Sequence, residues 1–250
     1  MNAGSQIILT CTFGGTAVRL LETGLDARAY EINLRAAQIA KQIARGRAFV
    51  AGSMGPLGKL PLAFGALSYQ DATDQFADQA RALIEGGVDL IAIESMSDLQ
   101  EIHAAIDGVR CINAELPIFA SMSFDTNGRT LLGITPTLAA RELLMKNVDA
   151  MGANCGHGPE DMAGIIREMR NSARNAVLIA KPNAGIPEVT REGIIYPSDP
   201  ERFATYAREW VRAGANIIGG CCGSTPKHIT AIKEALTPHA SSPTRQQMIT

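Results

Sequence analysis

Short apolar runs alternate with longer amphipathic segments along almost the whole chain. The runs are rich in β-branched and small apolar residues and lack a strict polar–apolar alternation. This pattern is typical of strands that are buried on both faces of a parallel sheet. We predict seven such strands, at residues 6–12, 48–52, 90–94, 117–124, 150–154, 177–181 and 216–219.

The segments between these runs repeat their apolar residues at helical spacing. Ser68 can cap one of the helices, and Gly86 can end it. Thr225 is a cap followed by Pro226 at the first helical position, and Gly214 can end the preceding helix. We predict seven helices, at about residues 27–44, 69–85, 98–113, 137–146, 159–170, 199–213 and 226–236.

Alternating strands and helices predict an α/β fold with a parallel sheet. No glycine-rich G-x-G-x-x-G follows the first strand and no P-loop occurs, which argues against a nucleotide-binding doubly wound sheet. A TIM (β/α)₈-type barrel fits the 250 residues and the regular spacing. Only seven units are visible, so the barrel is open, or an eighth unit is missing or comes from another chain. Residues 1–236 form this domain, and residues 237–250, rich in Ser, Thr, Pro and Gln, are expected to be a flexible C-terminal tail.

Composition excludes several classes of function. The formal net charge of −2 gives no electrostatic footprint for nucleic acid. No apolar stretch reaches the roughly 18 residues of a membrane span, and the N-terminus does not resemble a secretory signal. Five cysteines, an odd number, indicate reduced thiols in a cytoplasmic protein. Cys111 falls in a predicted helix, where we expect a small buried or half-buried apolar residue.

The remaining cysteines all fall at the carboxyl ends of predicted strands, which form the active face of a parallel barrel. They are Cys11, Cys155 and the adjacent pair Cys221 and Cys222. Adjacent cysteines rarely bond to each other, because the ring that they would close is strained. Three thiolates and an open position suit a catalytic zinc ion that keeps a bound thiol deprotonated. The alternative is that these cysteines are small packing residues in glycine-rich turns.

Several motifs resemble those of the homocysteine S-methyltransferase family. The resemblance covers roughly residues 6–236, with the motifs in the family's order, and one of them, FDTNGRTLLG, is most similar to the methionine synthase branch. The motifs are TCTFG at 10–14, VAGSMGP at 50–56, IESMSDL at 93–99, FDTNGRTLLG at 124–133, GANCGHG at 152–158, KPNAGIP at 181–187 and GGCCGSTP at 219–226.

The resemblance implies a methyltransferase with a zinc site, in which homocysteine thiolate becomes the fourth ligand, attacks a methyl group and yields methionine. Cys155, Cys221 and Cys222 match the three ligands of Zn²⁺. Glu94 matches the residue that receives the α-amino group of the substrate; a salt bridge at the barrel rim is the alternative. Asn183 is placed either to orient substrate or to hold a loop. The donor is left open between methylcobalamin on a corrinoid protein, S-methylmethionine and a betaine-like compound.

The sequence departs from the family in two places. The family opens with a further strand–helix unit whose loop holds the amino-acid end of homocysteine. We expect a partner chain, a second protomer or a missing exon-like segment to supply it. Cys11 stands where the family has asparagine, and is either an extra zinc ligand or a simple replacement. Two other functions stay open: a non-catalytic zinc-binding subunit, and a demethylase or methyltransferase with a different acceptor.

Overall fold

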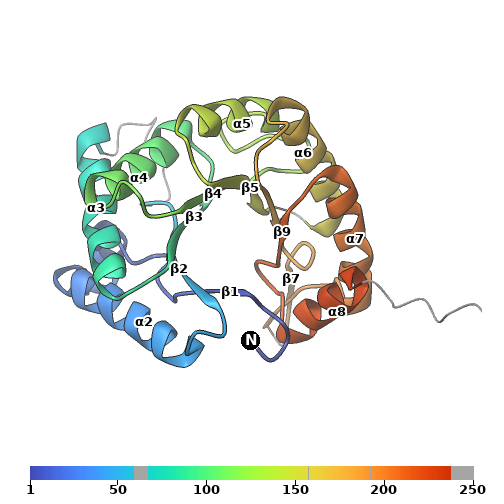
Figure 1. The fold of residues 1–250 in the computed structure, drawn as a ribbon, viewed down its shortest axis with the longest axis horizontal. Coiled ribbons are helices and arrows are strands. Elements are labelled where there is room, and N and C mark those ends of the chain that lie inside the picture. The colour runs from blue at the N-terminus through green and yellow to red at the C-terminus, as the bar shows by residue number, and fades with distance from the viewer. Residues whose placement is uncertain (59–66, 157, 192, 238–250) are drawn as a thin grey trace, which may run out of the picture.

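Seven parallel strands form one curled sheet (Figure 1) in the computed structural model, which describes residues 1–58, 67–156, 158–191 and 193–237. The strands lie side by side in chain order, and each pairs in parallel with the next. This arrangement confirms the predicted α/β fold of the TIM-barrel type. The strands are β1 (Ile7–Leu9), β2 (Phe49–Met54), β3 (Leu90–Met96), β4 (Ile118–Met122), β5 (Ala150–Cys155), β6 (Leu178–Pro182) and β9 (Ile217–Ile218).

Helices cover the outer face of the sheet, and every predicted helix is present within a few residues of its expected bounds (Figure 1). Ser68 and Asp71 form a reciprocal capping box at one helix, and Gly214, with a φ of 114°, ends another. These confirm the predicted start and stop signals. The helices are α2 (Ala29–Ala44), α3 (Tyr69–Glu85), α4 (Leu99–Ile112), α5 (Pro136–Met145), α6 (Pro159–Ser172), α7 (Pro200–Ala213) and α8 (Pro226–Leu236).

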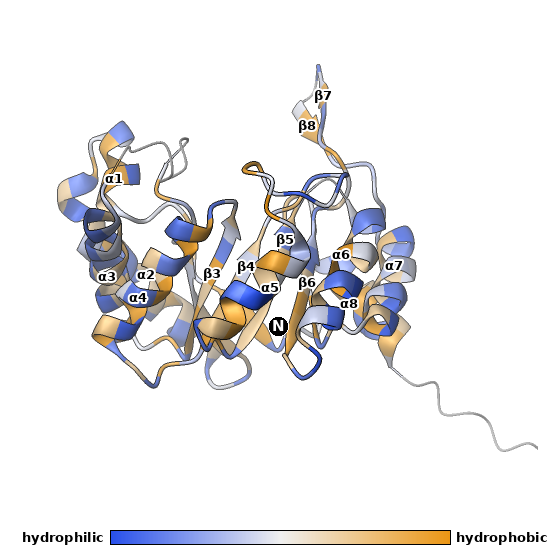
Figure 2. Ribbon diagram, turned by 90° about the horizontal axis from the view of Figure 1, so that it is seen from above, coloured by the Kyte–Doolittle hydropathy of each residue, from blue (hydrophilic) through white to orange (hydrophobic). Residues whose placement is uncertain are grey.

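Two short features are additional to the prediction. Helix α1 (Ala17–Leu20) and two 3₁₀ turns follow β1. An antiparallel hairpin of β7 (Glu188–Thr190) and β8 (Gly193–Ile195) projects beyond the carboxyl ends of the sheet strands (Figure 2). Its strands have three residues each and are exposed throughout, so they carry no pattern of burial that the sequence could display.

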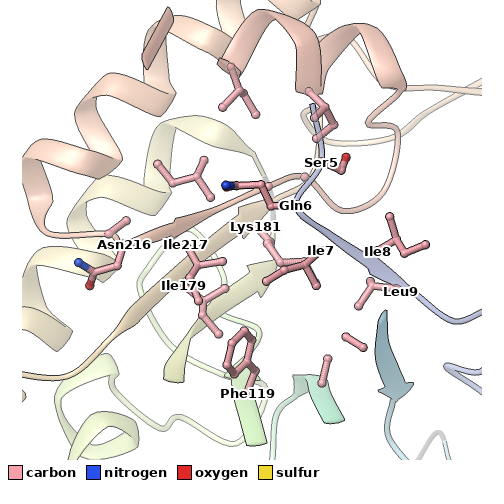
Figure 3. A pocket seen from close by; sticks show the side chains of 18 of the residues that line it. Ser5, Gln6, Ile7, Ile8, Leu9, Phe119, Ile179, Lys181, Asn216 and Ile217 are labelled. Carbon is pink, nitrogen blue, oxygen red and sulfur yellow. The ribbon is translucent and has the colours of Figure 1, made fainter. Parts of the chain in front are cut away.

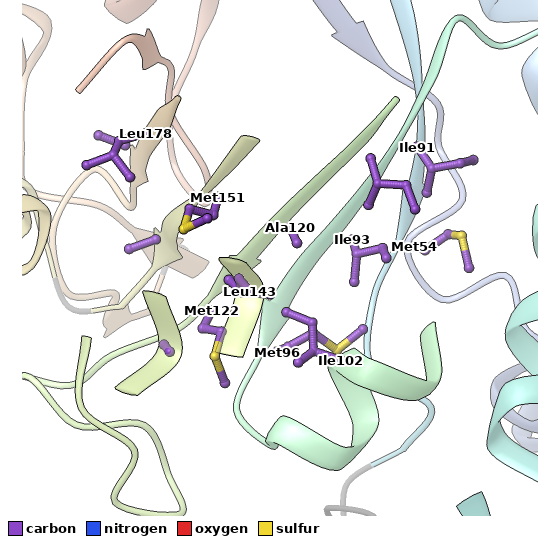
Figure 4. Packing of buried hydrophobic residues seen from close by; sticks show 14 of the residues in the cluster. Met54, Ile91, Ile93, Met96, Ile102, Ala120, Met122, Leu143, Met151 and Leu178 are labelled. Atoms are coloured by element: carbon purple, nitrogen blue, oxygen red, sulfur yellow. The ribbon is translucent and has the colours of Figure 1, made fainter. Parts of the chain in front are cut away.

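The main core lies between the sheet and its surrounding helices, where large side chains interdigitate (Figure 4). Trp210 is fully buried at the α6–α7 side; its ring meets Phe203 edge-on at 5.2 Å, and its indole N–H donates to the Pro159 carbonyl at 2.9 Å. Cys111 is exposed, so the expectation of burial was wrong. The reason is that α4 packs through a stripe containing Ile102, Ile106 and Val109, and position 111 lies off this stripe.

The inside of the curled sheet is less completely filled. Small side chains such as Ala51 and Ala92 face it, and a cavity of about 1060 Å³ opens between β1 and β9 (Figure 3). Ile7, Ile179 and Ile217 line this cavity. Among the described residues, no strand pairs with the outer edge of β1 or of β9. The described strands therefore form an open barrel.

Within the described part of the chain, no helix combines the length and the apolar character that a membrane crossing requires.

We predict that Trp210→Ala lowers the free energy of unfolding by about 3–5 kcal/mol, because it removes a buried ring and leaves a cavity. Val211→Ala is the matched control, since Val211 is 43% exposed on the same helix, and should change stability by less than about 0.5 kcal/mol. Urea titration measures both. Equal losses for the two variants would contradict the packing described above.

Candidate metal and acceptor site

Three thiols converge at the carboxyl ends of the strands. Cys155 ends β5, and Cys221 and Cys222 occupy the turn between β9 and α8. Their sulfur atoms all lie within 4.8 Å of one another, with Cys155–Cys222 at 4.0 Å and Cys221–Cys222 at 3.9 Å. Four sulfurs at about 2.3 Å around zinc are separated by about 3.8 Å in a tetrahedron. The thiols therefore have the spacing of three corners of a zinc site.

The backbone around these thiols adopts conformations that few residues tolerate. Cys155 has a φ of 62° and is followed by Gly156 at 72°. A side chain at Gly156 would place its Cβ 2.7 Å from the Phe124 carbonyl oxygen, and one at Gly223 would overlap the ring of Tyr196. Left-handed backbone at a non-glycine residue is uncommon and clusters at functional sites. Glycine is thus required on both sides of the site for steric reasons.

Asn183 joins the two loops that carry the thiols. Its amide nitrogen donates to the Gly156 carbonyl at 2.7 Å, and its amide oxygen accepts from the backbone N–H of Cys222 at 3.0 Å. Both ends of the side chain are therefore engaged with backbone, which is the loop-holding arrangement that the sequence left open. Contact between Asn183 and substrate stays a prediction.

The thiols shift one another's protonation. The Cys155 thiol donates to the sulfur of Cys221 and thereby lowers the pKa of Cys221 to about 6, against the effect of burial, with the nearby Lys181 ammonium and the Asn154 amide adding to the decrease. The same hydrogen bond and burial raise the pKa of Cys155. One thiolate therefore forms readily in this group even in the metal-free protein, and the chemistry of the donor set suits a soft cation.

Glu94 lies at the end of β3 with its carboxylate held from two sides. The Ser53 hydroxyl donates to Oε1 at 2.7 Å, and the Lys181 ammonium binds Oε2 at 2.6 Å. The carboxylate is nearly buried, with 7% of the side chain exposed. The salt bridge that was the alternative role of Glu94 is present, and its partner is Lys181, which reaches across from β6.

Sequence reasoning missed Asn154, which is 1% exposed and lies directly beside the thiols. Its amide oxygen accepts from the backbone N–H of Ser95 at 2.7 Å and from the Ser121 hydroxyl at 2.6 Å. Its amide nitrogen donates to the Ser95 hydroxyl at 2.6 Å and contacts the Cys221 sulfur at 3.8 Å. The signal was an asparagine immediately before a candidate ligand at the end of a buried strand.

Cys11 is exposed and is not part of the described group of three thiols. Its ligation of zinc stays a prediction. His157, the histidine of the GANCGHG motif, lies outside the described residues, as do residues 238–250 of the expected tail.

Comparisons with known proteins agree on one family. Residues 1–236 match the family model described as homocysteine S-methyltransferase. Methionine synthase of Mycobacterium leprae is 32% identical over 247 residues, covering 94% of this chain and 20% of that protein. Methionine synthase of Mycobacterium tuberculosis is 33% identical over 257 residues, covering 98% of the chain and 21% of that protein. The chain thus spans about a fifth of the length of these relatives.

Solved structures agree on the fold. The metallated form of the homocysteine methyltransferase MmuM from Escherichia coli superimposes with a TM-score of 0.77 at 24% identity, covering 93% of this chain and 80% of that one. Its oxidized form gives a TM-score of 0.76 with the same identity and coverage. The curled sheet described above is therefore of the same type as in these enzymes.

We predict that titration of the metal-free protein reveals one thiolate forming near pH 6, because the pKa of Cys221 is lowered while that of Cys155 is raised. Ultraviolet absorbance of thiolates measures this step, which should be absent in Cys221→Ser and present in Cys111→Ser. An unchanged absorbance up to about pH 8 in the wild type would contradict the prediction.

Proposed function

The chain belongs to the homocysteine S-methyltransferase family, and from this premise we propose that it transfers a methyl group to the thiol of homocysteine, giving methionine. The observation that carries the proposal is the group of three thiols within 4.8 Å, close enough to Lys181 and Glu94 for both charges to act on Cys221. The thiols suit the sulfur end of the acceptor, and the carboxylate of Glu94 suits its ammonium end.

We propose Cys155, Cys221 and Cys222 as the ligands of Zn²⁺. The metal, when bound, keeps a thiol ligand deprotonated near neutral pH, so that it remains a nucleophile. Asn183 supports this arrangement by fixing the two cysteine loops to each other, and Asn154 donates toward the sulfur of Cys221. No general base is required for a thiol that is already ionised.

Glu94 is proposed to receive the α-ammonium group of homocysteine. A carboxylate has about four lone-pair sites, of which Ser53 and Lys181 use one each. Because Glu94 is nearly buried, an ammonium placed there would be poorly screened by water and therefore attracted strongly. Asn183 is proposed to shape the acceptor site through the loops that it holds.

The proposed methyl donor is methylcobalamin carried by a corrinoid protein or domain. Two methionine synthases are among the relatives. The chain matches only about a fifth of each, and the rest of each relative lies outside the matched region. S-methylmethionine and a betaine-like donor are the other outcomes of a donor assay. The five free cysteines suit a reducing compartment, and we propose the cytoplasm.

We also propose that a further polypeptide segment, from a partner chain or a second copy, pairs with the open edges of β1 and β9. Gln6 and Thr10 hydrogen-bond with β2 through their backbone, and in a parallel pair the alternate residues face the other way. Ile7 and Leu9 thus direct their peptide groups toward the opening. Unpaired sheet edges readily accept another strand.

We predict that Cys221→Ala loses both zinc and methyl transfer to homocysteine, because the remaining two thiols cannot complete the site. Metal analysis of the purified protein and a methylcobalamin-to-homocysteine assay measure the two effects, with a loss of activity on the order of a hundredfold or more. Cys111→Ala is the matched control and should retain both.

Three results would discriminate among the alternatives. Retention of activity by Cys221→Ala in a zinc-free protein would contradict the proposal. Zinc binding without any affinity for homocysteine would instead indicate a non-catalytic subunit or a different acceptor. Cys11→Ser should leave zinc content unchanged if Cys11 is only a replacement, and lower it if Cys11 is an extra ligand.

For the open edge, we predict that in dilute protein the amide hydrogens of Ile7 and Leu9 exchange at least about tenfold faster than that of Thr10, which is bonded to Ala51. Hydrogen exchange followed by NMR measures this difference. Protection that increases with protein concentration would identify a second copy as the pairing chain. Equal protection of all three amides at every concentration would contradict the open edge.

A further inference from the structure

We propose that Lys181 binds the α-carboxylate of the acceptor, so that Glu94 and Lys181 together recognise an α-amino acid as a zwitterion. This inference rests on the proposed function, because it takes a thiol-bearing amino acid as the acceptor. It adds a residue that determines specificity and that is not one of the proposed metal ligands. The chain then selects against thiols that carry only one of the two charges.

The position of Lys181 is the first observation. The residue lies on β6 and its ammonium reaches Glu94 on β3, although β4 and β5 lie between these strands in the sheet. The side chain therefore crosses the inside of the curled sheet. Only 17% of it is exposed, and it lines the cavity between β1 and β9 (Figure 3). A lysine placed this way is available to a bound molecule rather than to bulk solvent.

The second observation is the unused hydrogen-bonding capacity of this ammonium. A lysine ammonium has three N–H donors. The described part of the chain gives Nζ a single acceptor, Oε2 of Glu94 at 2.6 Å. Its other two donors have no acceptor among the described residues and can be used by a ligand in the cavity that Lys181 lines. A carboxylate with two oxygens is the acceptor that matches them in number and charge.

The third observation is the closeness of the two opposite charges. In an α-amino acid, the ammonium and the carboxylate are both bonded to the α-carbon. The charged groups of Glu94 and Lys181 are equally close, at 2.6 Å. The ligand and the Glu94–Lys181 pair each have a positive and a negative end. When they lie side by side in opposite directions, each charge of the ligand contacts the opposite charge of the pair. A ligand without a carboxylate would instead bring a second ammonium to a carboxylate that already pairs with Lys181.

Hydrogen bonds to neighbouring strands fix the direction of this charge pair. Ser53 holds Oε1 of Glu94, while the backbone N–H of Ser53 donates to the Thr10 hydroxyl at 2.9 Å and its carbonyl accepts from the Thr12 hydroxyl at 2.7 Å. All three residues are buried. The Glu94 end is thus anchored to β1 and β2, which leaves Lys181 as the longer and more adjustable member of the pair.

The test uses the zinc-loaded protein and three thiols, with affinities measured by titration calorimetry. Homocysteine has both charges, γ-mercaptobutyrate lacks the ammonium, and γ-aminopropanethiol lacks the carboxylate. Lys181→Met should weaken the binding of homocysteine and γ-mercaptobutyrate on the order of ten- to a hundredfold. The affinity for γ-aminopropanethiol should stay within about threefold of the wild-type value or increase. Glu94→Gln should show the reverse selectivity, weakening the two ligands with an ammonium.

Lys233→Met is the matched control, because Lys233 lines the same cavity from α8 and should leave all three affinities within about twofold. Lys181→Arg should recover part of the affinity for the ligands with a carboxylate. If Lys181→Met does not fold, Lys181→Gln serves as the second uncharged variant. The wild type gives a measurement that needs no variant: homocysteine should bind on the order of tenfold more tightly than γ-aminopropanethiol.

Equal weakening of all three thiols by the uncharged variants, or no weakening, would overturn the inference. A wild type that does not distinguish homocysteine from γ-aminopropanethiol would overturn it as well. The proposed function is judged separately by methyl transfer. Selective binding without methyl transfer would contradict the proposed function and support the role of Lys181. Methyl transfer that the Lys181 variants weaken equally for all three thiols would support the proposed function and overturn the role of Lys181.

Discussion

Parallel pairing of the strands is the constraint on which the site depends. Because β3, β5, β6 and β9 run in the same direction, their carboxyl ends reach one edge, and residues distant in sequence meet there. The thiol of Cys155 arrives on β5 and those of Cys221 and Cys222 in the turn after β9. A core of large apolar side chains between the sheet and its helices holds these strands in register. The site itself therefore needs little regular structure of its own.

Fine placement of the thiols comes from hydrogen bonds between loops. Asn183 spans the loop after β5 and the turn after β9, and a left-handed backbone at Cys155 turns its side chain toward the pair. Such a conformation persists only where the surroundings stabilise it. Gly223, with no room for a side chain against Tyr196, shows that the turn is equally constrained. The sulfur spacing is thus a property of the loops, imposed on positions that the sheet provides.

Periodicity predicted the strands and helices because each is either fully buried or amphipathic, and cysteines at strand ends predicted the thiol group. The roles of Asn154 and Lys181 could not be predicted this way. Each depends on the distance to a residue on another strand, and a single asparagine or lysine has many possible partners. The helix that contains Cys111 was predicted correctly. The expected burial of Cys111 was wrong because the side of the helix on which it lies was not predicted. The β7–β8 hairpin has no buried residue to generate a pattern.

The two ends of the site rest on the two edges of the open sheet. Cys221 and Cys222 follow β9, whose two residues pair with β6 alone among the described strands. Glu94 depends on Ser53, which is held by Thr10 and Thr12 just after the edge strand β1. Edge strands this short are stabilised by few hydrogen bonds and open more easily than central ones. A segment that paired with β1 and β9 would consequently stabilise the thiol end and the acceptor end together, because each end is attached to one of these two strands.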